Sequence, residues 1–225
     1  PYNPGQNATI IDGQGQNRGV FVLSYSGGGV TLDMAGFIVR NGLGTGIGKR
    51  PGEDAYFGFG GGMFVENAAA VVLRDMRFEN NRAVGSDRGS GPGGTGSGGA
   101  LSFRTTASAY LENITFTGNQ ARGGNGGERG GGGHGGALYT FGSTVSGKSL
   151  TFTDNLAQSG NSSGSGQTSD GERADAFGGA AAFQINSTVR LEGVTARNNR
   201  AIGGNAGVYA GGGFGGAFMG EQANI

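Results

Sequence analysis

Pairs of neighbouring glycines recur along this chain at nearly constant intervals, and each pair is followed by a small or apolar residue. The intervals between successive pairs are 37, 37, 43 and 37 residues. A period of this length is typical of repeat architectures, in which each unit stacks on its neighbours to bury a shared core. The five segments are Gly61-Gly62-Met63, Gly98-Gly99-Ala100, Gly135-Gly136-Ala137, Gly178-Gly179-Ala180 and Gly215-Gly216-Ala217.

A second signature, Phe-x-x-Asn, follows the first four glycine pairs, and in its last copy an alanine replaces the phenylalanine. Another alanine stands two residues beyond each asparagine. Agreement at positions so far apart is not a result of glycine content alone, so we conclude that the chain is built from repeats. The residues are Phe78 and Asn81, Phe116 and Asn119, Phe152 and Asn155, and Ala196 and Asn199, followed by Ala83, Ala121, Ala157 and Ala201.

Within each unit the apolar residues alternate in short runs, as Leu101 and Phe103 do, which is the periodicity of strands and not of helices. The interval of three between Leu73 and Met76 breaks the alternation, so each unit is interpreted as three short strands that meet at corners. Strands wound in one direction predict an all-β fold, a parallel β-solenoid of about five coils, with equivalent residues of neighbouring coils about 4.8 Å apart.

Stacked coils give the signature residues structural roles. Phe78, Phe116 and Phe152 are expected to form an internal column of rings, which Ala196 interrupts. The repeated asparagines are expected in tight turns with a left-handed backbone, where each side chain bonds to its counterpart in the next coil. The alternative is a row of amides that binds a ligand.

A single domain is predicted over 1–225. The repeats occupy 61–97, 98–134, 135–177 and 178–214, residues 1–60 form divergent N-terminal coils, and 215–225 begin a further coil. In the first coil Val20 to Ser24 resembles an opening strand, and Val30-Thr-Leu32 matches Val71-Val-Leu73. Phe37 precedes Asn41 by four residues instead of three, which predicts a one-residue insertion. An end cut within a coil exposes an unpaired strand edge, so we expect either a longer chain or a docked partner there.

Long glycine-rich loops leave the coils after each asparagine and return at the next glycine pair. Loops of this length are uncommon in compact domains. Because they all start and end at one corner, they must lie beside one another, and the lack of side chains lets glycine backbones approach closely. Two interpretations remain open: a second, glycine-dense layer, or a set of independent surface loops.

Composition narrows the function classes. The chain has 54 glycines, no cysteine, and 16 basic against 16 acidic residues. A balanced charge offers no field that would recruit nucleic acid. The absence of cysteine excludes disulfides and thiolate metal sites and is compatible with export. No apolar run is long enough to span a bilayer, and any export signal is expected to have been removed or to lie outside the segment.

Catalytic and metal-binding candidates are few. Asp75, Glu112 and Glu192 fall near equivalent corners, but Asp75 is one position out of phase and Lys148 occupies the place between the glutamates, so solvated charges explain the pattern better than a catalytic cluster. His134 stands in a glycine-rich loop with no second ligand nearby in the sequence. We therefore predict no catalytic, cofactor or metal site.

The alternation of Gly-Gly-Ala-aliphatic with Phe-x-x-Asn, as in Gly99-Ala-Leu101 with Phe116-Thr-Gly-Asn119, resembles the paired repeats of chlamydial polymorphic outer-membrane proteins and related autotransporter passengers. The resemblance covers residues 60 to 220. It implies a right-handed parallel β-helix displayed at a bacterial surface or secreted, with adhesive or structural roles.

The function expected from these observations is an extracellular structural or adhesive module without catalytic activity, whose partners are cell-surface glycans or other protein subunits. Two alternatives remain. One is a subunit of a larger assembly or filament, self-associating end to end or side by side. The other is a carbohydrate-active enzyme of the lyase or hydrolase type, because parallel β-helices also carry such enzymes.

Overall fold

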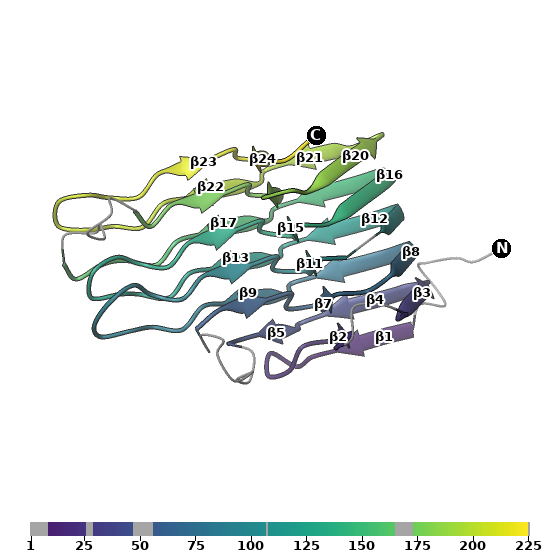
Figure 1. Cartoon of the computed structure of the whole chain (residues 1–225), viewed down its shortest axis with the longest axis horizontal. Helices are drawn as coiled ribbons and strands as arrows, with labels where there is room; N and C mark the ends of the chain where they lie inside the picture. Colours follow the sequence, from purple (N-terminus) through teal and green to yellow (C-terminus); the bar gives the residue numbers. More distant parts are fainter. Residues whose placement is uncertain (1–8, 26–28, 47–55, 107, 165–172, 225) are drawn as a thin grey trace.

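The computed structural model describes residues 9–25, 29–46, 56–106, 108–164 and 173–224, and every regular element within them is a β-strand. The strands form four parallel sheets in which neighbours are about 40 residues apart in sequence, which makes a parallel β-solenoid of about five coils. The all-β solenoid predicted from the repeats is thereby confirmed. Figure 1 shows the coils stacked side by side, with long arms extending from one end of each.

Two of the sheets enclose the core. The first, which we call the long sheet, has the order β1-β4-β8-β12-β16-β20, with β3 paired to β8 and β21 paired to β16. The second, which we call the groove sheet because a surface groove runs along it, has the order β2-β7-β11-β15-β19-β24. The long sheet comprises β1 (Thr9–Asp12), β3 (Thr31–Ala35), β4 (Phe37–Arg40), β8 (Ala70–Glu79), β12 (Ala109–Thr117), β16 (Thr144–Thr153), β20 (Thr188–Glu192) and β21 (Thr195–Arg197). The groove sheet comprises β2 (Val20–Leu23), β7 (Met63–Glu66), β11 (Leu101–Arg104), β15 (Leu138–Phe141), β19 (Ala181–Gln184) and β24 (Phe218–Glu221).

The other two sheets lie in the arms, one where the chain leaves the coil and one where it returns. The outgoing sheet comprises β5 (Leu43–Gly44), β9 (Arg82–Val84), β13 (Gln120–Arg122), β17 (Leu156–Gln158) and β22 (Arg200–Ile202). The returning sheet comprises β6 (Gly58–Phe59), β10 (Gly96–Ser97), β14 (Gly133–His134), β18 (Ala176–Phe177) and β23 (Gly213–Phe214). One coil therefore runs through the long sheet, out and back along an arm, and into the groove sheet.

The phenylalanines stack inside the coils as their spacing predicts. Phe78, Phe116 and Phe152 are fully buried, with ring centroids 5.3 Å and 4.8 Å apart and nearly parallel planes. Ala196 pairs with Phe152 and interrupts the column, and the ring of Phe218 closes it edge-on at 5.7 Å.

The asparagines form a ladder through the corner between the long sheet and the outgoing sheet. Asn119 Nδ2 donates to Asn155 Oδ1 at 3.0 Å and to the Phe78 carbonyl at 2.9 Å. Asn119 Oδ1 accepts from both the backbone N–H and Nδ2 of Asn81, each at 3.0 Å. Buried amides with this many partners hold neighbouring coils in register.

The expectation of a left-handed backbone at these asparagines is wrong by one residue. The positive φ angles belong to the preceding residues: Asn80, Gly118, Asp154 and Asn198 at φ 54, 65, 56 and 54. The turn is thus made by one residue, and the next residue is free to point its amide into the ladder.

The prediction of separate strands on the two sides of the phase change is wrong for the central coils and holds in the first and last coils, where β3 and β4, and β20 and β21, are separate. β8, β12 and β16 each continue through the phase change, where a single left-handed residue bends the strand without ending it: Asp75, Asn113 or Ser149. One left-handed residue reverses the direction in which the following side chains point, but the backbone stays extended. Hydrogen bonding to the neighbouring strands therefore resumes after the bend. In the last coil Gly193 separates β20 from β21.

The first coil contains no insertion. Val39 pairs with Phe78 and so holds the phenylalanine position, while Gly42 donates its N–H to Asn81 Oδ1 and stands where the later coils have asparagine. The predicted correspondence of Val30 with Val71 is wrong by two residues, because Leu32 is the residue that pairs with Val71.

The first glycine pair is shifted by one residue. Met63 pairs with Leu101, which places Gly62 opposite Ala100 and makes Gly60 and Gly61 the counterparts of Gly98 and Gly99. Gly60 has a positive φ of 47°, as the first glycine of every later pair also has.

The arms stack as a second layer, as one of the two interpretations predicted. Backbone hydrogen bonds connect the outgoing and returning arms. The N–H of Gly124 donates to the Gly94 carbonyl, that of Gly131 to the Gly124 carbonyl, and that of Gly160 to the Gly131 carbonyl, at 2.8 to 2.9 Å. A Cβ at Gly131 would collide with the Gly94 carbonyl. The two walls are therefore close because glycine removes the side chains between them.

Within the residues that the structure describes, no helix is long and apolar enough to cross a bilayer.

Candidate functional site

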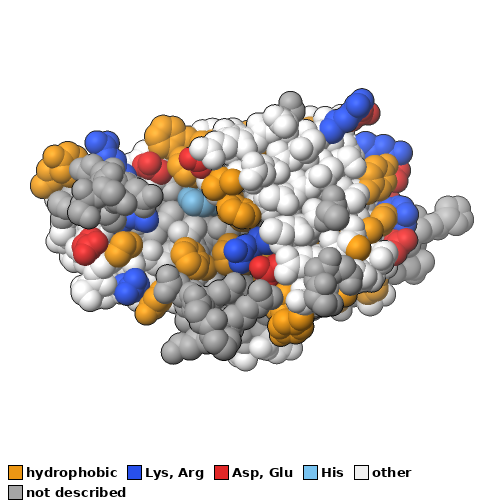
Figure 2. Space-filling model, in the orientation of Figure 1, with side chains coloured by type: hydrophobic (Ala, Val, Ile, Leu, Met, Phe, Trp, Pro, Cys, Tyr) orange, Lys and Arg blue, Asp and Glu red, His pale blue; other side chains and the backbone are white. Residues whose placement is uncertain are grey.

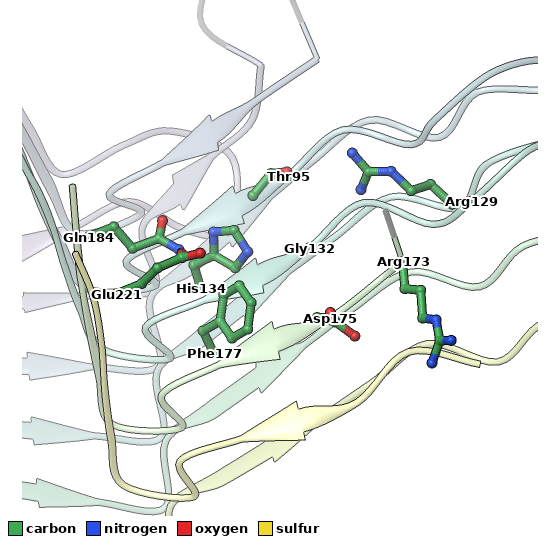
Figure 3. Close-up of a pocket in the computed structure, with 9 residues that line it drawn as sticks. All are labelled: Thr95, Arg129, Gly132, His134, Arg173, Asp175, Phe177, Gln184 and Glu221. Atoms are coloured by element: carbon green, nitrogen blue, oxygen red, sulfur yellow. The ribbon is translucent and has the colours of Figure 1, made fainter. Parts of the chain in front are cut away.

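A concave groove runs where the groove sheet meets the returning sheet, on the outer side of both. The groove contains a cavity of about 640 Å³. Figure 2 shows the histidine in this hollow with hydrophobic side chains beside it, and Figure 3 shows how the lining residues converge. These residues are Thr95, Arg129, Gly132, His134, Arg173, Asp175, Phe177, Gln184 and Glu221.

Aromatic rings follow the groove from the first coil to the last, and we call this series the aromatic track. Successive ring centroids are between 4.9 and 6.4 Å apart, so each ring contacts or nearly contacts the next. In spatial order the track is Phe21, Phe64, Phe59, Tyr139, His134, Phe177 and Phe214.

The N-terminal half of the groove is filled by its own side chains. Phe64 and Tyr139 are buried although they project outward from the groove sheet. Arg18 lies over Phe64, with 5.6 Å from the guanidinium carbon to the ring centroid, and its Nε donates to the Gly60 carbonyl at 2.9 Å. These side chains close the groove between Phe64 and Tyr139, and a separate cavity of about 350 Å³ remains at the N-terminal end, beside Arg18 and Phe21.

The C-terminal half is open because the next coil carries a smaller residue. Ala182 pairs with Tyr139, so a methyl group follows a phenol at the position that fills the groove. Phe177 and Phe214 then line the groove with partly exposed rings, and 47% of Phe214 is accessible to solvent. We call this half the open groove.

Polar side chains hold fixed positions on both sides of the open groove. Gln184 Nε2 donates to Glu221 Oε2 at 2.7 Å on the side of the groove sheet, and Asp175 Oδ1 accepts the Gly212 N–H at 2.7 Å on the side of the arms. Arg173 lies over the ring of Tyr209, 5.4 Å from its centroid. Rings in the floor with oriented polar groups at the rims are typical of small-molecule sites.

His134 contributes a neutral ring to this surface. Its centroid lies 4.9 Å from Phe177 and 6.2 Å from Tyr139. Burial lowers the pKa of His134 to about 4, and the positive charge of Arg129 acts in the same direction. At neutral pH the imidazole therefore presents a flat, uncharged face, similar in shape to the phenylalanines beside it.

Acidification is expected to destabilise the protein through His134. The unfolded chain binds a proton near pH 6.5 and the folded chain only near pH 4, so the free energy of unfolding should fall as the pH is lowered through that window and be insensitive to this group above it. Because the chain has one histidine, a proton NMR titration reads its pKa directly. Urea unfolding of His134→Gln should show a flatter pH dependence, and a pKa near 6.5 in the folded protein would contradict this.

The repeat residues singled out in the sequence lie in the core and at the corners, and none of them lines the cavity. Two of the three corner carboxylates follow the expected pattern of solvated charges. Glu112 Oε1 lies 2.8 Å from Lys148 Nζ, which lowers the pKa of Glu112, and Lys148 is in register with Glu192. Asp75 instead accepts a hydrogen bond from Asn113 at 2.6 Å. Among the described residues, no three acidic, histidine or cysteine side chains gather as a metal site.

The groove was not predicted from the sequence, although the sequence contains a repeated aromatic position that indicates it. An aromatic ring stands directly before four of the five left-handed glycines that begin the glycine pairs: Phe59, His134, Phe177 and Phe214, with Ser97 at the fifth. His134 was interpreted as a loop residue, whereas it belongs to β14 and pairs with Phe177. A second ladder was also missed, in which Asp87, Asn125, Asn161 and Asn205 stand six residues after the buried asparagines and bond from arm to arm.

No family model matches the chain, and no curated protein or solved structure matches it either.

Proposed function

We propose that the chain is an extracellular adhesive module that binds carbohydrate in the open groove. The observation that carries this proposal is the combination of partly exposed rings in the floor with carboxylate, amide and guanidinium groups at the rims. Sugars have apolar ring faces that stack on aromatic side chains and hydroxyl groups at their edges that bond to such polar groups.

Rigid surroundings support the same proposal. His134 and Phe177 project from strands that are paired on both sides, Phe214 projects from the edge strand β23, and the rim residues Asp175 and Gln184 are held by internal hydrogen bonds. Side chains fixed in this way lose little conformational entropy when a ligand binds. The motif resemblance to chlamydial polymorphic outer-membrane proteins and autotransporter passengers supports a surface-exposed or secreted location and an adhesive role.

The test is a screen of the purified chain on an array of immobilised oligosaccharides and polysaccharides. We expect binding to a restricted group of glycans and loss of that binding in Phe177→Ala, with an unchanged midpoint of thermal unfolding as the control for folding. Absence of binding to every glycan would contradict the proposal. Incubation with each bound glycan tests the enzymatic alternative, because shortened products would make the chain a carbohydrate-active enzyme.

A second candidate function, assembly through the coil ends, is favoured by an apolar cavity of about 340 Å³ at the C-terminal coil. Phe183, Leu191 and Phe218 are among its lining residues. Sedimentation over a range of concentrations distinguishes the two functions, since end-to-end assembly makes the mass rise with concentration.

A further inference from the structure

We propose that the ligand of the open groove is an uncharged, linear polysaccharide that lies parallel to the solenoid axis, with successive sugars over His134, Phe177 and Phe214. This inference rests on the proposed function of carbohydrate binding and specifies the ligand's length, direction and charge.

The direction follows from the register of the three rings. His134 pairs with Phe177, and Phe177 pairs with Phe214, so all three occupy one position of consecutive coils. Their centroids are 4.9 and 5.6 Å apart. A pyranose unit in an extended glycan is similar in length to the spacing of paired strands, about 4.8 Å. One sugar per coil therefore matches the protein's own repeat.

The lining of the cavity shows the same elongation. Thr95, His134, Phe177 and Glu221 belong to four successive coils, so the cavity extends along the axis and not across one coil. The two rims run alongside it, with Gln184 and Glu221 on one side and Arg129, Arg173 and Asp175 on the other (Figure 3). A chain lying between the rims presents hydroxyl groups to both of them.

The length of the bound segment is limited by the filled half of the groove. Tyr139 is buried next to His134, and Phe64 is buried further along the track. A polysaccharide that extends beyond His134 toward Thr95 therefore finds no further exposed ring to stack on, because Ser97 holds the ring position of that coil. Affinity should rise with chain length until the three ring positions are occupied and then stay constant.

The charge of the lining favours an uncharged polymer. Two guanidinium groups, Arg129 and Arg173, are matched by two carboxylates, Asp175 and Glu221, and the imidazole of His134 is neutral at pH 7. A polyanion would gain no net attraction from such a surface and would place some of its charges against the carboxylates.

The experiment is calorimetric titration of the whole chain with β-1,4-linked glucose and N-acetylglucosamine oligosaccharides, from the monosaccharide to the hexasaccharide. In at least one series, affinity should rise by about tenfold for each added sugar up to three and then level off, which corresponds to about 1.4 kcal/mol for each sugar that stacks on a ring. Phe214→Ala should lower the limiting affinity about tenfold and move the plateau to a shorter chain.

Phe21→Ala is the matched control. Phe21 is 48% exposed against 47% for Phe214, but it lines a separate cavity at the N-terminal end of the track, beyond the buried Phe64, so its removal should leave the affinity unchanged. A monosaccharide that binds as tightly as the hexasaccharide would overturn the inference and leave the proposed function intact.

The remaining outcomes separate the two proposals further. If the glycan array gives ligands but neither oligosaccharide series binds, or if carboxylated oligosaccharides of equal length bind more tightly, the inference is wrong while carbohydrate binding stands. If no glycan binds on the array or in solution, the proposed function itself fails.

Discussion

Replacing Gly136 with alanine is expected to lower the free energy of unfolding by about 4 kcal/mol or more, enough to prevent folding of a marginally stable chain. A Cβ at this position would collide with the Gly179 carbonyl oxygen and lie 2.6 Å from the backbone nitrogen of Leu156. Both contacts are to backbone of other coils, so no side-chain rotation relieves them. Gly99 and Gly179 have the same surroundings, which explains why the second glycine of each pair recurs.

Urea unfolding followed by circular dichroism measures this effect, with Gly89→Ala as the control. Gly89 lies in an arm, and a Cβ there has nothing within 4 Å. Its substitution should change the free energy of unfolding by less than about 0.5 kcal/mol. Equal stability of the two variants would show that the arms and the coil do not approach as closely as the structure has them.

The second large effect is expected for Asn119→Ala, which should destabilise the protein by about 4 kcal/mol. The substitution leaves the backbone N–H and one Nδ2 hydrogen of Asn81 without their acceptor and removes a donor to the Phe78 carbonyl. These groups are buried in the ladder, so water does not replace the lost bonds without disrupting the corner.

Asn125→Ala gives the matched comparison, because Asn125 occupies the second ladder of the same coil. Its Oδ1 accepts the Asn161 N–H at 2.9 Å, but the bond is exposed and water can substitute for it. We expect a loss of no more than about 1 kcal/mol in the same urea experiment. A loss as large as that of Asn119→Ala would place the main stabilising ladder in the arms.

The coil was predictable from the sequence because its determinants are local and repeated. Phe116 and Phe152 stand at the same place of consecutive units, and a repeat that stacks must bring them together. The bend within β12 was harder to predict, because Asn113 both turns the chain and lets ladder pairing continue, and the apolar pattern alone shows only the change of phase. Gly60 to Gly62 form a run of three, so the sequence did not show which two make the corner.

The groove was less predictable because its two sides come from segments with different periodic signals. The rings before the glycine pairs, such as Phe177, belong to two-residue strands that are too short for any alternation to be visible. The opening next to His134 depends on Ala182 following Tyr139 in register, and that relation exists only once the coils are stacked. Polar rims such as Asp175 are held by backbone groups of another coil, which a sequence pattern does not reveal.

The most direct test of carbohydrate binding in the open groove is the NMR signal of His134, the one histidine of the chain, during titration with the β-1,4-linked oligosaccharides. A sugar stacked beside Phe177 should shift the imidazole Hε1 resonance saturably, with the dissociation constant found by calorimetry. Calorimetric binding that leaves this resonance unmoved would show that the sugar is held elsewhere on the protein and would contradict the assignment of the site.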